Sequence, residues 1–280
     1  MADNKTAFIQ RVVSSALAGF GLLALGVYGG TLGLQFACTA AVVLGTREYA
    51  RIAFRHWKLP VIAEHAFWLV AMATYVALFR LQAPLLPVFA VANTVFLVLT
   101  LWLARNKVTN EQLLAALGVG SFGLTYCVVF PFYATSLVAL NKGSQWFLLL
   151  LLVVFAGDTF AYFGGRFFGR HKMLAQISPN KTWEGAVAGL LGSSVVGMIH
   201  LATVFADVPW YSGLLFCVIC GVAAQSGDLL MSLVKRVAQV KDSGHIMPGH
   251  GGVLDRLDGV FIASPLVYAF ALYVTTHASA

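Results

Sequence analysis

Charge is scarce in this sequence of 280 residues, since only 10% of them are Asp, Glu, Lys or Arg, whereas 59% are hydrophobic. About a quarter of the residues of a typical soluble domain are charged, so the composition excludes a soluble globular protein. The apolar runs are continuous and leucine-rich rather than alternating, which excludes a membrane β-barrel, the other structure that satisfies backbone groups in lipid. The sequence therefore predicts an all-α, polytopic integral membrane protein.

Cysteine is also rare, and all four cysteines lie in apolar runs. Cys217 and Cys220 have the C-x-x-C spacing of some zinc and redox sites. Such sites need accessible thiolates and polar neighbours. We therefore expect reduced cysteines that serve only in packing.

A membrane-spanning helix needs roughly 20 apolar residues, and the sequence contains about nine such runs. They cover residues 11–28, 32–54, 61–79, 84–104, 112–137, 145–165, 185–206, 211–234 and 259–277. The first run is too long for a signal peptide and no cleavage pattern follows it, so we expect a retained helix. We expect residues 1–144 to hold about five transmembrane helices that form a scaffold, and residues 145–280 to hold the remaining transmembrane helices.

Basic residues predict the orientation, because Lys and Arg accumulate on the cytoplasmic side of membranes. With the N-terminus inside and the C-terminus outside, all of the 18 Lys and Arg residues except Arg80 and Lys142 lie on the inner side. The net charge of +7 then faces anionic lipid headgroups and cytoplasmic anions, without a nucleic-acid partner. We expect a multi-pass protein of the cell inner membrane whose active site faces the cytoplasm.

Two connections on the predicted inner side, about 166–184 and 235–258, are longer and more polar than the others. Together with the runs that lead into them, they hold more than half of the 11 acidic residues, namely Asp158, Glu184, Asp228, Asp242, Asp255 and Asp258. We expect the chemistry to take place there.

Asp158 lies inside an apolar run that ends in FAGDTFAYFGGRFFGRHK. Helical spacing places it near one face with Tyr162, Gly165 and Arg166. Carboxylates inside a membrane are costly and usually functional, although an ion pair with Arg166 that only holds helices together is the alternative. The segment 164–171 is not a phosphate-binding P-loop, because it lacks the required Lys and Ser or Thr and no strand precedes it.

The segment SPNKTWEG, residues 178–185, contains a helix start. The free N–H groups and the dipole at a helix start favour an anion, so Lys181, Thr182 and the following N–H groups are candidates to bind a phosphate. The alternative is a simple helix cap, and this motif alone does not separate the two.

A polar stripe follows the eighth apolar run, because Gln225, Asp228, Ser232, Lys235 and Gln239 recur at helical spacing. Such a stripe must face protein or water rather than lipid. It leads directly into the second polar connection.

That connection reads KDSGHIMPGHGGVLDRLDG over residues 241–259. Gly249, Gly251 and Gly252 allow close approach of the backbone, and successive N–H groups can form an anion pocket. Asp255 and Asp258 share a helical face if the ninth helix begins that early. Carboxylate oxygens suit Mg²⁺ that bridges to substrate phosphates.

Zinc is the less fitting cation for this connection. His245 and His250 are present, but no His/Cys set of tetrahedral type accompanies them. Mg²⁺ is therefore the expected cation. The structural alternative is a loop whose charges simply pair with one another.

Taken together, these motifs resemble the phosphatidate cytidylyltransferases, the CDP-diacylglycerol synthases. The resemblance rests on Ser232, Lys235-Arg236, Lys241-Asp242, Pro248, His250-Gly251-Gly252, Asp255-Arg256 and Asp258, and upstream on Asp158 to Arg166 and Ser178 to Gly185. The first half of the chain matches only in hydropathy.

The resemblance implies Mg²⁺-assisted attack of phosphatidic acid on the α-phosphate of CTP, which yields CDP-diacylglycerol and pyrophosphate. It also implies a homodimer, with dimer contacts in residues 1–144 and the catalytic transmembrane region in residues 145–280. The implied catalytic residues are Asp228, Asp255, Lys241, Asp258 and Asp158. Asp228, Asp255 and Asp258 are the implied metal ligands, and the number of acids allows a second cation. The implied substrate contacts are Arg166, Lys172, Ser178, Lys181, Thr182, Ser232, Lys235, Arg236, Asp242, Gly249, His250, Gly251, Gly252 and Arg256.

Three other functions remain open. A CTP-dependent lipid kinase also needs acids and bases at the membrane surface. A CDP-alcohol phosphotransferase motif begins at Asp258-Gly259, but Ser264 and Pro265 follow Ala263 without the expected Arg or later Asp pair. An anion or lipid transporter is expected to have inverted repeats and helices broken within the membrane, and the sequence shows neither.

Overall fold

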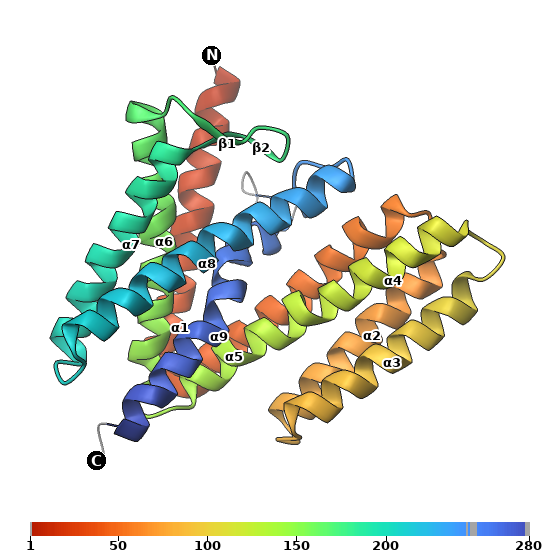
Figure 1. The fold of residues 1–280 in the computed structure, drawn as a ribbon, viewed down its shortest axis with the longest axis horizontal. Coiled ribbons are helices and arrows are strands. Elements are labelled where there is room, and N and C mark those ends of the chain that lie inside the picture. The colour runs from red at the N-terminus through yellow and green to blue at the C-terminus, as the bar shows by residue number, and fades with distance from the viewer. Residues whose placement is uncertain (1, 245, 247–250, 278–280) are drawn as a thin grey trace. The chain divides into compact units, whose positions relative to one another are not determined.

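The computed structural model describes residues 2–244, 246 and 251–277, most of them in helices (Figure 1). In chain order the elements are α1 (Ala2–His56), α2 (Val61–Phe79), α3 (Leu85–Ala104), α4 (Asn110–Leu124), the π-helix η1 (Thr125–Val129), α5 (Phe130–Val138), α6 (Gly143–Phe168), β1 (Lys172–Leu174), β2 (Ser178–Thr182), α7 (Trp183–Val204), α8 (Trp210–Val237) and α9 (Leu254–His277).

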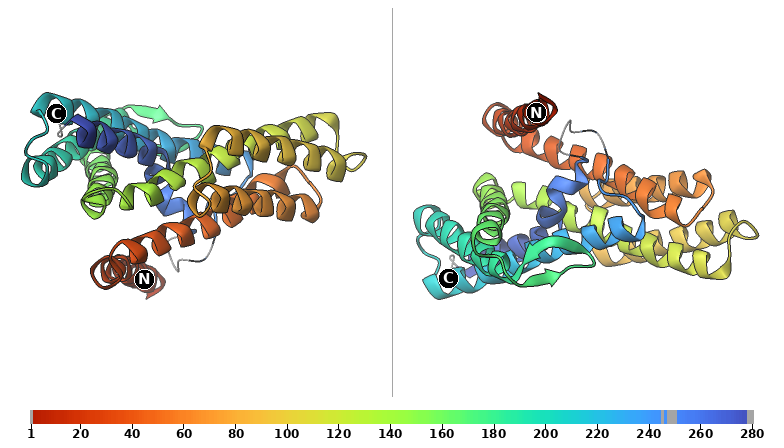
Figure 2. Two further views of the ribbon diagram at one scale, coloured as in Figure 1. Left: turned by 90° about the horizontal axis from the view of Figure 1, so that it is seen from below. Right: turned by 90° about the horizontal axis from the view of Figure 1, so that it is seen from above.

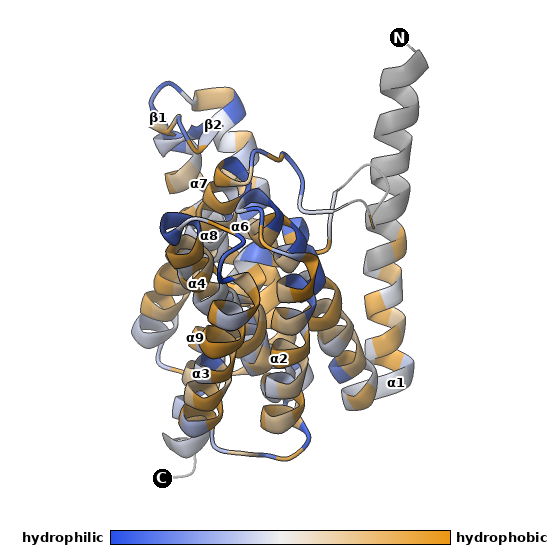
Figure 3. Cartoon of the chain, turned by 90° about the vertical axis from the view of Figure 1, so that its right-hand side faces the viewer, coloured by the Kyte–Doolittle hydropathy of each residue, from blue (hydrophilic) through white to orange (hydrophobic). Residues whose placement is uncertain are grey.

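Eight helices in these described ranges are long and apolar enough to cross a membrane. They begin with Gly19–His56 and end with Leu254–Thr276, and α4, η1 and α5 together form one of them, Asn110–Val138. Figure 3 shows α2 and α3 as hydrophobic over most of their length. The predicted all-α, multi-pass membrane fold is confirmed.

Helix α1 contains the first two predicted spans as two arms. They meet at Gly30, whose backbone is not helical (φ 54°, ψ −137°). The chain changes direction there (Figure 2), and the arms approach so closely that a Cβ atom on Gly33 would overlap the carbonyl group of Leu25. Glycine alone adopts this φ without strain. Counting the two arms separately accounts for the expectation of about nine spans.

The chain divides into two compact units, which are described separately. The first consists of Met1–Thr135 and Val234–Leu257, and the second of Ser136–Leu233 and Asp258–Ala280. The expected division of roles between residues 1–144 and 145–280 stays a prediction. The compact units follow another boundary, because the segment Val234–Leu257 packs with the N-terminal helices.

Aromatic side chains fill the core of the first unit. Phe67 of α2 packs against Phe54 of α1 and Phe96 of α3, with ring centroids 5.1 and 5.5 Å apart. Tyr49 of α1 is fully buried, and its hydroxyl donates a hydrogen bond of 2.7 Å to the carbonyl of Val119 in α4. Buried phenol groups usually find such a partner, and this one fixes α1 against α4.

The π-helix η1 also contacts α1. Pro131 has no N–H group to donate to the carbonyl of Cys127 four residues earlier, and the N–H of Phe130 instead reaches the carbonyl of Thr125, five residues back. The hydroxyl of Thr46 in α1 lies 3.4 Å from the carbonyl of Cys127 and partly replaces the missing donor. This segment of α1 is therefore held at two points.

Small residues allow α6 and α7 to pack closely in the second unit. Gly157 and Gly164 of α6 face Ser193 and Ala188 of α7, and the Ser193 hydroxyl donates to the carbonyl of Val153 at 2.7 Å. Small side chains and hydrogen bonds between helices are typical of membrane interiors.

The cysteines play the packing role expected for them. All four are free and buried. In the second unit, Cys217 lies against Gly197, where a Cβ atom would come within 2.6 Å of its sulfur.

The first long connection forms a β-hairpin in the second unit, which the sequence reasoning did not anticipate. Strands β1 and β2 are antiparallel, and Lys172 pairs with Thr182 (Figure 2). Glu184 fastens the hairpin to α7, because its carboxylate accepts hydrogen bonds from the N–H groups of Arg170 and His171 at 3.1 and 3.2 Å. These bonds hold the start of the hairpin against the first turn of α7, which directly follows β2.

Candidate active site

Helix α8 carries the predicted polar stripe. The side-chain amide of Gln225 donates to the carbonyl of Ala186 in α7 at 3.0 Å, and the hydroxyl of Ser232 donates to Asp228 Oδ1 at 3.3 Å. The Gln225 amide therefore faces protein, whereas the bond between Ser232 and Asp228 stays within α8. The stripe ends earlier than expected, because α8 ends at Val237 and Gln239 has a left-handed backbone with φ 58°.

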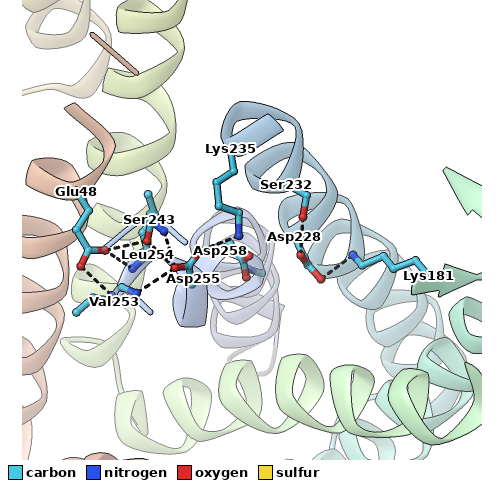
Figure 4. Close-up of polar contacts among 12 residues, drawn as sticks. Glu48, Lys181, Asp228, Ser232, Lys235, Ser243, Val253, Leu254, Asp255 and Asp258 are labelled. Carbon is cyan, nitrogen blue, oxygen red and sulfur yellow. Dashed lines mark hydrogen bonds and ion pairs between the residues drawn. The ribbon is translucent and has the colours of Figure 1, made fainter. Parts of the chain in front are cut away.

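Asp228 and Lys181 form an ion pair inside the second unit (Figure 4). The Nζ atom of Lys181 in β2 lies 2.6 Å from Oδ2 of Asp228 in α8, and about a third of each side chain is exposed. The hairpin therefore brings a predicted phosphate-binding lysine to a predicted metal ligand. Both groups remain accessible to solvent.

Thr182 takes the cap position that was left open as an alternative. It is buried, and its side-chain oxygen accepts a hydrogen bond from the N–H of Gly185 at 3.1 Å. This N-cap starts α7. Binding of phosphate by Thr182 stays a prediction.

Both oxygens of the Asp255 carboxylate have partners in the first unit (Figure 4). Its Oδ1 atom lies 2.7 Å from the Nζ atom of Lys235. Its Oδ2 atom accepts hydrogen bonds from the N–H and hydroxyl of Ser243, at 2.7 and 2.9 Å, and from the N–H of Gly252, at 3.0 Å. Only 9% of the Asp255 side chain and 14% of the Lys235 side chain are exposed. An ion pair and hydrogen bonds of this kind offset the free-energy cost of burying a charge.

The glycines of this turn are required by close contacts. Gly251 has φ +85°, and a Cβ atom there would lie 2.7 Å from Oδ2 of Asp255. A Cβ atom on Gly252 would overlap the Ser243 hydroxyl. The predicted role of Gly251 and Gly252 in close backbone approach is confirmed for these two positions. Gly249 and His250 lie outside the described residues, as does His245.

Asp258 also lies near the start of α9, because that helix begins at Leu254. This early start meets the condition under which Asp255 and Asp258 share a helical face. In the second unit Asp258 is 7% exposed, and its Oδ1 atom accepts a hydrogen bond from the N–H of Gly259 at 2.8 Å. Its backbone carbonyl lies against Gly227 of α8, where a Cβ atom would come within 2.6 Å.

The remaining predicted residues lie at the surface or near it. Asp158 is exposed on α6, and Arg166 donates a hydrogen bond of 2.8 Å to the hydroxyl of Tyr162. Ser178, at the start of β2, is half-buried. The other predicted site residues in this set are exposed, namely Arg166, Lys172, Arg236, Lys241, Asp242 and Arg256.

One residue of this region escaped the sequence reasoning. Glu48 of α1 is 2% exposed, and its carboxylate accepts hydrogen bonds from the N–H groups of Val253 and Leu254 at 3.1 and 2.9 Å (Figure 4). The available signal was the presence of an acid inside the second apolar run, 32–54, which is the rule that identified Asp158.

A sequence profile of the cytidylyltransferase family matches residues 9–274 of the chain, which is nearly its whole length. The chain belongs to this family. The match includes the helices of the first half as well as the motifs of the second.

Proteins similar to the chain carry related names. A phosphatidate cytidylyltransferase of Rickettsia felis is 33% identical over 150 residues, which is 51% of this chain and 66% of that protein. Phosphatidate cytidylyltransferase 5, chloroplastic, of Arabidopsis thaliana is 30% identical over 298 residues, 95% of this chain and 72% of its own length. A phosphatidate cytidylyltransferase of Brucella abortus is 34% identical over 229 residues, 78% of this chain and 79% of that protein.

The donor set of this cytidylyltransferase fits a hard divalent cation. Mg²⁺ in proteins is usually held by one or two carboxylates together with waters and substrate phosphates. Asp228 and Asp255 each offer a carboxylate, and each faces a lysine ammonium group at 2.6 or 2.7 Å. Across the described ranges 2–244, 246 and 251–277, no three His, Cys, Asp or Glu side chains gather into a metal-binding group. Each carboxylate by itself is of the chemical type that Mg²⁺ takes as one ligand beside waters and substrate oxygens.

Proposed function

We propose that the protein is a membrane-bound CTP:phosphatidate cytidylyltransferase, which makes CDP-diacylglycerol and pyrophosphate from phosphatidic acid and CTP. The observation that carries this proposal is the pairing of a lysine with an aspartate at two places in the family's motifs, Lys181 with Asp228 and Lys235 with Asp255. Each pair combines a cation that can hold phosphate oxygens with a carboxylate that can hold a metal ion. The names of the similar proteins support the choice of substrates.

The reaction joins two phosphate groups. An oxygen of the phosphatidate phosphate attacks the α-phosphorus of CTP, a new P–O bond forms, and the bond between the α-phosphorus and its bridging oxygen breaks. The electron pair of that bond leaves with pyrophosphate. Because the lipid phosphate is already anionic at neutral pH, no dedicated general base is needed. Catalysis then consists of alignment and neutralisation of charge.

The chain's own residues have distinct roles in this proposal. Lys235, Arg236 and Lys241 hold the triphosphate, together with His250 and the backbone of residues 249–252. Arg166, Lys172, Lys181 and Thr182 hold the lipid phosphate or the departing pyrophosphate. Asp158 assists as an accessory acid.

Mg²⁺ is the cation that the proposal assigns to the site. Asp228 and Asp255 would hold it, with Asp258 as a third ligand or as a support for the other two, and the acids leave room for a second cation. When bound, the ion neutralises charge on the nucleotide oxygens. The two lysines, Lys181 and Lys235, would bind phosphate oxygens.

The proposal includes the setting of the enzyme. The distribution of Lys and Arg favours an inner-membrane protein with the N-terminus and the active site on the cytoplasmic side. We also expect a homodimer. Membrane lipid is both the surroundings and the source of one substrate.

Transfer of label from CTP to lipid tests the function directly. Purified protein in detergent micelles with phosphatidic acid is given CTP labelled at the α-phosphate or at the γ-phosphate. Appearance of the α-label in lipid supports cytidylyl transfer. Appearance of the γ-label instead identifies a lipid kinase, and metal-independent uptake of anions by proteoliposomes without label transfer identifies a transporter.

A further inference from the structure

The N-terminal half of the chain contributes a buried carboxylate to the turn that carries Asp255. In the first unit, Oε1 of Glu48 accepts a hydrogen bond from the N–H of Val253 at 3.1 Å. Its Oε2 atom accepts one from the N–H of Leu254 at 2.9 Å and lies 3.1 Å from the Ser243 hydroxyl. These partners lie 195 to 206 residues away in the sequence.

Val253 directly precedes α9, and Leu254 is its first residue, so both of these N–H groups lie at the helix start. The N–H groups at a helix start have no partner within the helix, and the helix dipole favours a negative charge there. Glu48 therefore accepts hydrogen bonds from the N–H groups of Val253 and Leu254, which the helix start leaves without a partner inside the helix. Asp255 is the next residue after these two donors.

Ser243 connects the two carboxylates. Its hydroxyl oxygen lies 3.1 Å from Oε2 of Glu48 and 2.9 Å from Oδ2 of Asp255. A hydroxyl group has one hydrogen to donate, so it can bond only one carboxylate at a time. A change at Glu48 must therefore alter the hydrogen bonding of Asp255.

The turn is shaped around the Glu48 carboxylate. A Cβ atom on Gly244 would lie 2.5 Å from Oε1, and one on Gly252 would overlap Oε2. On the side of α1, Glu48 lies between Thr46 and Tyr49, which bond the carbonyls of Cys127 and Val119. Glu48 is thus fixed from both sides.

We infer that Glu48 is a positioning residue, which holds the turn before α9 and, through Ser243, sets the orientation of the Asp255 carboxylate. This inference rests on the proposed function and gives the N-terminal half a part in it. A group that orients a metal ligand affects metal affinity and turnover rather than binding of a distant part of the substrate.

The test compares Glu48→Gln with Ser243→Ala and with a matched control, Glu64→Gln. Glu64 is another largely buried acid of the first unit, but its partner is Arg55, at 3.5 Å, rather than the turn. Each protein is purified in detergent. Its folded fraction, its kcat, its KM for phosphatidate and its half-saturating Mg²⁺ concentration are measured.

The second measurement does not depend on activity. Hydrogen–deuterium exchange is followed in peptides that cover residues 251–257, where the N–H groups of Val253 and Leu254 are bonded to Glu48. Loss of these bonds accelerates exchange, because exchange reports local opening.

For Glu48→Gln we expect kcat to fall, and the half-saturating Mg²⁺ concentration to rise, by about tenfold to a hundredfold, with an unchanged KM for phosphatidate and faster exchange in 251–257. Glu64→Gln should match the wild type in kcat, in half-saturating Mg²⁺ concentration, in KM for phosphatidate and in exchange of residues 251–257. Wild-type kcat and Mg²⁺ dependence in folded Glu48→Gln would overturn the inference. A stability loss alone, with normal activity per folded molecule, would overturn it as well.

Two outcomes need separate treatment. If Glu48→Gln does not fold, Ser243→Ala decides, since it keeps the bonds from Glu48 to the backbone: a raised Mg²⁺ requirement supports the inference and an unchanged one overturns it. If the wild type transfers no cytidylyl group, the proposed function fails. Hydrogen–deuterium exchange in residues 251–257 is then the measurement that tests whether Glu48 positions the turn. Unchanged exchange in Glu48→Gln then removes that role.

Discussion

Lys235 Nζ lies 2.7 Å from Asp255 Oδ1, and both side chains are largely withdrawn from solvent. A buried ion pair of this kind is weak evidence for stability, because desolvation offsets much of the attraction between the charges. Under the proposed function, Asp255 would hold a metal ion and Lys235 would hold a phosphate oxygen.

Asp255→Asn removes the charge that pairs with Lys235 and places an amide where three hydrogen-bond donors now converge. We expect cytidylyl transfer to fall by at least about a hundredfold, because a preorganised electrostatic group is lost. The variant should still insert into the membrane. Asp207→Asn, which changes an exposed aspartate between α7 and α8, is the control and should be fully active. Wild-type rates in Asp255→Asn would exclude a metal role.

Lys181→Ala removes the ammonium group that lies beside Asp228. We expect KM to rise by about tenfold, or about 1.4 kcal/mol, as for loss of a hydrogen bond to a charged group. If Lys181 contributes uniform binding, kcat changes less than KM. Steady-state kinetics with both substrates provide the measurement, and Lys107→Ala, an exposed lysine between α3 and α4, is the control. An unchanged KM for both substrates would contradict the assignment.

Removal of divalent cations should abolish transfer. The acids of the motifs are oxygen donors without an accompanying tetrahedral His/Cys set, which favours Mg²⁺ over Zn²⁺. We expect a chelator to stop the reaction and added Mg²⁺ to restore it fully, measured as α-label in lipid. Full activity in the presence of chelator would show that the carboxylates act without a metal ion.

Gly252→Ala should damage the turn. Its Cβ atom would overlap the Ser243 hydroxyl and the Glu48 carboxylate, and forced overlap in a packed site costs about 1–3 kcal/mol. Gly118→Ala is a matched control, because no atom lies within 4 Å of a Cβ atom there and its helical backbone favours alanine. Thermal unfolding in detergent should show a lower midpoint for Gly252→Ala and an equal or higher one for Gly118→Ala. Equal midpoints for Gly252→Ala and the wild type would mean that the turn adapts.

Orientation can be tested with cysteine labelling. The four native cysteines are buried, so they should react slowly with a membrane-impermeant thiol reagent. In intact cells, Lys142→Cys should react when the reagent is outside, whereas Lys107→Cys should react only after the membrane is opened. The reverse pattern would place the active site on the opposite side.

Much of the fold was predictable because hydropathy is a local property. The predicted span 61–79 coincides with α2, and the others after it differ from the observed helices by a few residues at each end. The bend of α1 at Gly30 falls in the gap between the first two predicted spans, 11–28 and 32–54. The hairpin of β1 and β2 was not foreseen, because its strands are short and polar and form only by pairing with each other.

The sequence by itself determined that this chain spans a membrane, which helices it forms, and which acids and bases its polar connections carry. These properties follow from residue type and from spacing over a few turns. Only the tertiary structure decided which charges meet, as when Lys181 reaches Asp228 and Glu48 reaches the start of α9. A hydrogen bond between Glu48 and Ser243 spans 195 residues of sequence, and such a contact depends on how the helices pack rather than on any pattern along the chain.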